Sequence, residues 1–180
     1  MKAGRIDSKP SLVVADSHLS RGAAGGGETF HRRGGPYGAT NGAERVVAVD
    51  VTGLPLAARV APANLTETQV TELLLEDLVD SGRPAGWEWS WSNKGVPERS
   101  ARRLSRQFGF EVRRVGWGPQ PADPVTGKCV FKPLAHAWRV EVAHGLVMRR
   151  RRLARSFENT ASSGTAWLQL GCISLTLGSA

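Results

Sequence analysis

Cysteine is scarce in this sequence. Only two cysteines occur among 180 residues, Cys129 and Cys172, and neither lies in a CxxC pattern or at the Cys/His spacing of a zinc site. The sequence therefore predicts neither a disulfide framework nor a structural zinc ion. Long apolar runs are missing as well, since no stretch approaches about 18 uninterrupted apolar residues and no apolar signal core follows the first lysine. We expect a cytoplasmic protein with no membrane partner.

Acidic residues are outnumbered by basic ones. The chain has 24 Lys and Arg against 16 Asp and Glu, for a net charge of +8, which favours a polyanionic partner. The charge is also uneven: residues 67 to 80 carry five acids and no base, whereas residues 98 to 114 and 139 to 155 carry six arginines each. This pattern predicts one face for nucleic acid and one turned away from it.

The front of the chain predicts a tail, a strand and a loop. After a tail over residues 1 to 10, the valine-rich residues 11 to 15 are typical of a buried strand that ends at the carboxylate of Asp16. Eight glycines fall within residues 22 to 43, which we interpret as a loop with basic character. The loop lacks the GxxxxGK[ST] pattern of a phosphate-binding loop.

The middle of the chain predicts a hairpin followed by a helix. Two β-branched runs, residues 45 to 51 and 54 to 60, flank the turn signal Thr52-Gly53. Thr66 and Gln69 then form a capping-box pattern. Apolar residues at helical spacing follow at Val70, Leu73, Leu74 and Leu78.

The second half predicts strands and helices in alternation. The expected elements are a strand over residues 87 to 92 that stops at Asn93, a helix over 97 to 107, a strand over 111 to 115, a helix carrying Glu141, and a buried closing helix over 166 to 177. This order is typical of a mixed α/β fold in which helices cover a central sheet.

Three of these positions carry oxygen ligands. Asp16 and Asn93 follow strands that can be sheet neighbours, and Glu141 lies on a helix that can cross both. Carboxylates brought together in this way suit metal-dependent phosphoryl transfer. The alternative for Glu141 is a surface acid on a solvated basic helix. Asp50 can approach the same place, but a structural or solvent-facing role suits it better.

The chain also resembles a known family, the bacterial insertion-sequence transposases of the DDE type. The resemblance extends from about residue 11 to 175, and the runs that carry it are residues 14 to 17, 47 to 57, 62 to 64, 138 to 141 and 152 to 154. It implies a ribonuclease H-like catalytic domain over residues 11 to 178, with a mixed five-stranded sheet flanked by helices. Such enzymes cleave DNA at element ends and join it to target DNA.

The resemblance also assigns roles to the acids. Family members hold Mg²⁺ or Mn²⁺ through Asp, Asp and Glu, so Asp16 matches the first acid and Glu141 the third, and both become metal ligands. At the second position this chain reads Asn93-Lys94-Gly95, where the family has an aspartate. An asparagine keeps one oxygen but loses the charge, so we expect weaker metal binding and impaired catalysis. A catalytically dead DNA-binding remnant is the alternative.

The expected partner is DNA, at element ends and at the target. Only about ten residues precede the first strand, so the chain resembles either a truncated remnant or the second frame of a two-frame element. A homodimer on DNA is left open. His144, one turn after Glu141, is either a contact to the scissile phosphate or an ordinary polar residue on an exposed helix. The expected DNA-backbone contacts are Arg139, Arg149, Arg150, Arg151, Arg152, Arg102 and Arg103.

Overall fold

The sheet at the centre of the molecule is mixed, with helices on both faces. The computed structural model describes residues 12–23, 31–32, 40–82, 88–91, 96–114, 126–127 and 136–178. Within these ranges the strands are β1 (Leu12–Arg21), β2 (His31–Arg32), β3 (Thr40–Asp50), β4 (Pro55–Pro62), β5 (Glu88–Trp91) and β6 (Glu111–Arg114). The helices are α1 (Glu67–Asp80), α2 (Glu98–Phe108), α3 (Trp138–Met148) and α4 (Ala161–Gly178), with the short 3-10 helix η1 (Arg151–Leu153) between the last two.

Strand β1 joins the antiparallel and the parallel halves of the sheet. It pairs antiparallel with β3 from Val13 to Arg21, and it pairs parallel with the described part of β5 from Leu12 to Ala15. Strand β5 is in turn parallel to β6, whereas β2 and β4 both pair antiparallel with β3. The mixed α/β prediction is confirmed, but the described sheet has six strands instead of the expected five, because the two-residue β2 is added.

The expected end of the first strand was wrong. Strand β1 does not stop at Asp16 but continues for five more residues to Arg21. Its second half is polar and half-buried, so its apolar pattern stops at Ala15, yet the ladder to β3 continues. Pairing with a fully buried neighbour extends this strand beyond its own hydrophobic run.

The expected glycine-rich loop over residues 22 to 43 is shorter than predicted. Strand β3 already begins at Thr40, and Gly42 lies so close to the carbonyl oxygen of Ser20 that an added Cβ would be 2.1 Å from it. A glycine is therefore required where β3 approaches β1. Here the glycine serves close backbone packing within a strand.

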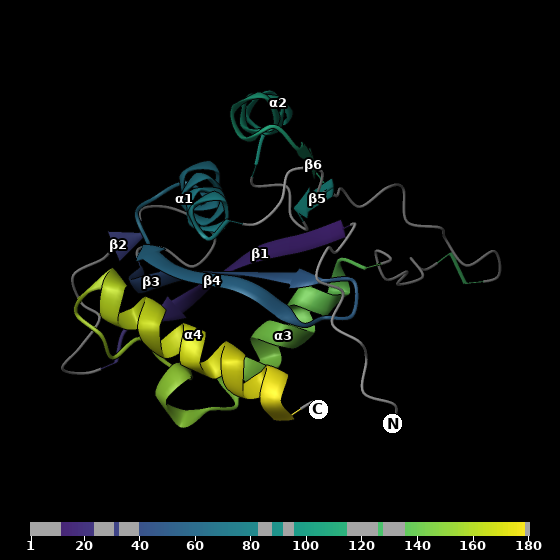
Figure 1. Ribbon diagram of the computed structural model, residues 1–180. Helices are drawn as coiled ribbons and strands as arrows, with labels where there is room; N and C mark the ends of the chain where they lie inside the picture. The colour runs from purple at the N-terminus through teal and green to yellow at the C-terminus, as the bar shows by residue number, and fades with distance from the viewer. Residues whose placement is uncertain are drawn as a thin grey trace.

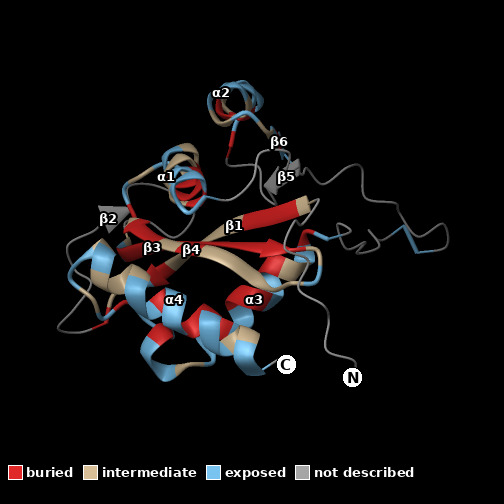
Figure 2. Ribbon diagram, in the orientation of Figure 1, coloured by how far each residue is buried: buried red, intermediate tan, exposed pale blue. Residues whose placement is uncertain are grey.

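The core has two layers, one on each face of the sheet (Figure 2). Successive residues of β3 supply both: Val46 and Ala48 pack toward α1 and α2, whereas Val47 and Val49 pack toward α3 and α4. This alternation follows from the two-residue period of a strand. Because both faces are covered, the middle of β3 from Val46 to Val49 is a continuous apolar run. Figure 1 shows α1 and α2 on one side of the sheet and α3 and α4 on the other.

The hairpin and the first helix form as the sequence predicts. Strands β3 and β4 pair around the turn at Val51 and Thr52, and Gly53 has a φ of 91°, in the left-handed region that favours glycine. Helix α1 begins with the predicted capping box, in which Thr66 accepts from the Gln69 backbone N–H and Gln69 accepts from the Thr66 N–H. Its buried residues are Val70, Thr71, Leu74, Leu75 and Leu78.

Helix α4 differs from the expected buried helix. It begins at Ala161, and only Leu168, Gly171 and Cys172 are buried, whereas Leu170, Ile173 and Leu177 are more than half exposed. One side of α4 lies against β4 and also contacts the strand through hydrogen bonds. Val60 N–H donates to Thr165 Oγ1 at 2.9 Å, and Gln169 Nε2 donates to the Ala58 carbonyl at 3.3 Å. The helix thus covers the outer edge of β4, which leaves its other side in solvent.

The helices of the described ranges are too short or too polar to cross a bilayer.

Asp50 has a structural position at the end of β3. Its Oδ1 accepts from the Thr52 N–H at 2.8 Å, from Thr52 Oγ1 at 2.6 Å and from the Leu54 N–H at 3.0 Å. The side chain is 3% exposed. It therefore fixes the hairpin turn.

We expect Asp50→Ala to lower the free energy of unfolding by about 2 kcal/mol, because three donors lose a charged acceptor. Asp50→Asn keeps one side-chain carbonyl oxygen and should lose less. Asp80→Ala, at an exposed acid on α1, is the control and should change stability by less than about 0.5 kcal/mol. Urea denaturation followed by circular dichroism measures all three. Equal losses for Asp50→Ala and Asp80→Ala would contradict this role.

Candidate functional site

Asp16 follows directly on the last described pair of the parallel ladder. The residue before it, Ala15, pairs with Trp91, the last residue of β5. Asp16 itself remains paired with Val47 of β3. Because Val14 belongs to the core layer beneath α3, Asp16 two residues later is on the same face. The prediction that β1 and β5 are sheet neighbours is confirmed, while Asn93 lies outside the described residues.

Helix α3 crosses the sheet over Asp16. Val140, Ala143 and Val147 pack into the core layer below the helix. His144, on the same side, places its Nε2 at 3.1 Å from the backbone carbonyl oxygen of Asp16. Glu141 lies one helical turn before His144 and is exposed. Residues three apart on a helix are neighbours, so Glu141 is on the part of α3 that meets β1 near Asp16.

His144 is buried, contrary to the expected exposed position. Its exposure is 6%, and its ring faces that of His18 at a centroid distance of 5.8 Å. Burial lowers the pKa of His144 to about 4; the bond to the Asp16 carbonyl opposes this shift, and the nearby His18 and Arg45 add to it. Burial, and then the charge of Arg45, also lower the pKa of His18. Both shifts favour the neutral form of the imidazole ring.

Arg45 is a functional candidate that sequence reasoning missed. It is 5% exposed, and its guanidinium donates to the carbonyl of Leu153 and, at 3.0 Å, to that of Arg155. Burial lowers its pKa to about 10, so the side chain stays charged at pH 7. Arg45 thus ties the arginine-rich segment after α3 to the central sheet. The only signal in the sequence is an arginine at the start of a valine-rich strand.

Two carboxylates of the described chain suit a divalent metal ion. Asp16 and Glu141 offer oxygen ligands, which Mg²⁺ and Mn²⁺ prefer. Among the described residues no group of three His, Cys, Asp or Glu side chains gathers at a metal-binding distance. Two carboxylates still fit Mg²⁺, because this ion usually keeps several water ligands and takes only one or two from the protein.

The arginines after α3 differ in their contacts with the rest of the fold. The helix ends at Met148, before the arginine run, and Arg149 and Arg151 are exposed. Arg150 donates to the Leu146 carbonyl at 3.2 Å. Arg152 is held by three groups: its guanidinium pairs with Glu158, and it lies over the rings of Phe157 at 5.6 Å and Trp167 at 5.0 Å.

Arg139 lies at the start of α3, beside the hairpin turn. Its guanidinium carbon is 4.9 Å from the centre of the Trp138 ring, and its NH1 donates weakly to the Thr52 carbonyl at 3.4 Å. It is half-buried. Arg139 is therefore on the same helix as Glu141 and also supports the hairpin.

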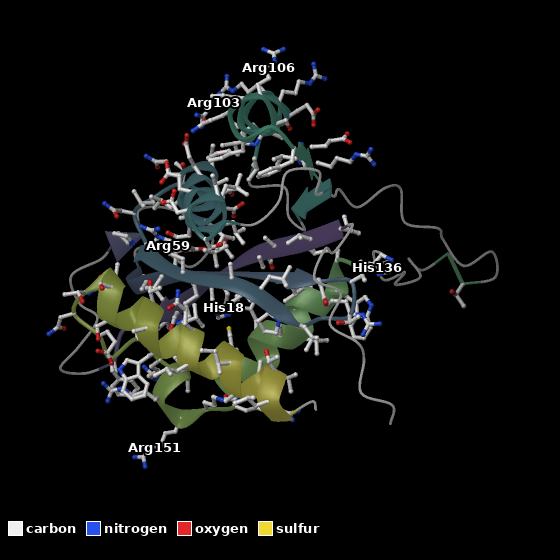
Figure 3. The ribbon with its side chains drawn as sticks, viewed as in Figure 1. His18, Arg59, Arg103, Arg106, His136 and Arg151 are labelled. Carbon is white, nitrogen blue, oxygen red and sulfur yellow. The ribbon has the colours of Figure 1, made fainter. Side chains whose placement is uncertain are left out.

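Arg102 and Arg103 lie on the opposite side of the sheet from the arginine run. Their helix α2 packs on the same layer as α1, whereas Leu153 after the run packs on the α3 layer. Figure 3 shows Arg103 and Arg106 at one end of the molecule and Arg151 at the other. Arg103 forms two bonds to Glu72 of α1, at 2.8 and 2.9 Å, and Arg102 pairs with Glu98. The two basic segments therefore form two separate surfaces.

Comparisons with known proteins give partial similarity in structure. No protein-family model matches the sequence, and no curated protein matches it. Among solved structures, the catalytic core domain of BIV integrase is similar with a TM-score of 0.48 and 18% identity, over 90% of this chain and 82% of that chain. At TM-scores of this size the likeness assigns neither a family nor an activity.

Two larger assemblies contain chains that are also similar. One is the simian T-cell lymphotropic virus intasome in complex with the PP2A regulatory subunit B56 gamma, with a TM-score of 0.46 and 10% identity over 93% of this chain and 49% of that chain. The other is the Mos1 strand transfer complex, with a TM-score of 0.41 and 12% identity over 94% of this chain and 52% of that chain. The chain thus spans about half the length of these two proteins.

Arg152 should matter for stability where Arg151 does not. We expect Arg152→Ala to lower the free energy of unfolding by about 1 kcal/mol, because it removes ring packing and a partly solvated ion pair. Arg151→Ala removes the same charge from an exposed neighbour and should be neutral. Thermal melts should separate the two by about 3 °C for a chain of this size. Coincident melting curves would show that the Arg152 contacts do not stabilise the fold.

Proposed function

We propose that this chain is the catalytic domain of a DDE-type transposase with a ribonuclease H-like fold. It would carry out metal-dependent DNA cleavage and strand transfer for a bacterial insertion sequence. The observation that carries the proposal is the crossing of α3 over β1, where His144 contacts the Asp16 backbone one turn from Glu141. This crossing supports a site that Asp16 and Glu141 share, because it puts one turn of α3 against the strand that carries Asp16.

In this proposal Asp16 and Glu141 hold Mg²⁺ or Mn²⁺. A bound cation supplies charge for the attacking and leaving oxygens of a phosphodiester. The rigid part of the site is Asp16, which is held in the central strand by its pairing with Val47. The adjustable part is Glu141, on the exposed flank of α3. The exposed Arg149 follows Glu141 by about two helical turns and can bind the DNA backbone.

Asn93 is the proposed weak point of the site. The last residue of β5, Trp91, pairs with the residue before Asp16, and Asn93 follows two residues later in the sequence. The resemblance assigns the second acid to this position. An amide at this position offers a metal ion less negative charge than a carboxylate does, so we propose that this chain binds the metal weakly and is catalytically impaired.

Asn93→Asp should raise metal-dependent activity if the amide is the cause of impairment. Strand transfer is measured on a DNA carrying the element ends, in Mg²⁺ and in Mn²⁺, for the native chain and the variant. We expect a gain of about 100-fold or more in Mg²⁺. The removal of one group that stabilises charge in a transition state typically costs at least this much, and the variant restores such a group. Glu141→Gln in the Asn93→Asp background is the control and should be inactive. Equal activity of native chain and variant would refute the impairment.

The second candidate is a catalytically dead DNA-binding remnant of the same fold. It is favoured by the exposed arginines after α3, which are present whether or not a metal binds. Metal-dependent nicking separates the two candidates, because a remnant would bind DNA and leave it intact.

Both candidates predict a hierarchy among the arginines. We expect Arg149→Ala and Arg151→Ala each to lower the salt slope of DNA binding by about 0.9, the change expected when the protein neutralises one phosphate fewer. Arg103→Ala should change the slope less, since Arg103 is bonded to Glu72 on the other side of the sheet. Fluorescence anisotropy over a salt series measures the slopes. A larger effect at Arg103 would place the DNA on α2.

A further inference from the structure

The contact between His144 and Asp16 joins α3 to the central strand β1. The Asp16 carbonyl, one residue beyond the described pair of Ala15 with Trp91, accepts a hydrogen bond from His144 at 3.1 Å. A carbonyl oxygen can only accept, so the Nε2 nitrogen carries the proton.

The hydrogen bond between His144 and Asp16 is directional, whereas the apolar packing around it is not. Val140, Ala143 and Val147 are at most 2% exposed and fix α3 against the sheet. Apolar contacts are non-directional, so they tolerate a small shift or rotation of a helix. A hydrogen bond has preferred distances and angles. His144 therefore fixes the position of α3 along β1. The ring of His18 packs against it.

We infer that His144 is a positioning residue that holds the Glu141 carboxylate at the distance from Asp16 that a divalent cation requires. Glu141 lies one turn from His144 on the helix, so any shift of α3 moves the carboxylate with it. The bond is made to the backbone of Asp16 itself, the residue that supplies the other carboxylate. The inference rests on the proposed function, because it needs Asp16 and Glu141 to bind one metal ion.

Two substitutions of similar length isolate the hydrogen bond. His144→Gln keeps a nitrogen donor where Nε2 stands, whereas His144→Met fills similar space without a donor. Mn²⁺ affinity of the full chain is measured by electron paramagnetic resonance of the free ion. We expect His144→Met to weaken Mn²⁺ binding by about tenfold, as loss of a residue that orients a ligand typically does. His144→Gln should restore most of the affinity.

A matched control separates positioning from stability. Val147→Ala removes packing one turn further along α3 and does not touch Asp16. It should lower the melting temperature while leaving the Mn²⁺ affinity unchanged. A long-range ¹H–¹⁵N spectrum of the native chain should also show His144 protonated at Nε2. An Nε2 without a proton would overturn the inference without any variant having to fold.

The outcomes distinguish this inference from the proposed function. If the native chain binds Mn²⁺ only when Asp16 is intact, and folded His144→Met binds it equally well, the positioning role is wrong and the metal site stands. If the native chain binds no Mn²⁺, or if Asp16→Asn binds it as tightly, the proposed metal site is wrong, and the positioning role falls with it. Weaker binding in His144→Met with recovery in His144→Gln supports both.

Discussion

The hydrogen bond between His144 and the backbone carbonyl of Asp16 is the contact on which the candidate site depends. Strand β3 pairs with β1 along to Arg21, and the described part of β5 pairs with it from Leu12 to Ala15. Buried backbone polar groups require hydrogen-bond partners, and a side chain of a crossing helix serves as one here. A helix, the central strand and a carboxylate-bearing residue therefore meet at one position.

The layer beneath α3 is unusual in its buried polar groups. It contains a charged arginine, Arg45, which donates to backbone carbonyls and whose charge lowers the pKa of the buried His144 and the half-buried His18. A buried guanidinium needs such partners, because its transfer from water is expensive. The carbonyls of Leu153 and Arg155 accept hydrogen bonds from the Arg45 guanidinium, and these bonds hold the segment after α3 against the sheet. The exposed arginines of that segment project from a fixed backbone.

Local signals in the sequence were sufficient for some elements and insufficient for others. The hairpin turn and the capping box at Thr66 depend on residues within a few positions of each other, and both formed as predicted. The extension of β1 depends on β3 partners 21 to 29 positions away, and the burial of His144 depends on the Asp16 carbonyl, 128 positions away. Periodicity also failed for α3, since apolar residues such as Trp138 and Val142 occur on its exposed side. Contacts with Trp167 and Glu72 decide that Arg152 and Arg103 are engaged within the fold, and neither the spacing nor the composition of the sequence indicates these contacts.

The hydrogen bonds of Thr165 and Gln169 with β4 have a consequence for the protein in a crowded cell. An open strand edge is a template on which another chain can add a strand and begin to aggregate. On β4 that edge is already used, because helix side chains bond to the main chain at Val60 and Ala58. Strand β6, the outer strand at the other end of the described sheet, is instead short and carries Glu111, Arg113 and Arg114. The sheet is thus shielded from growth by a helix at one end and by charge at the other.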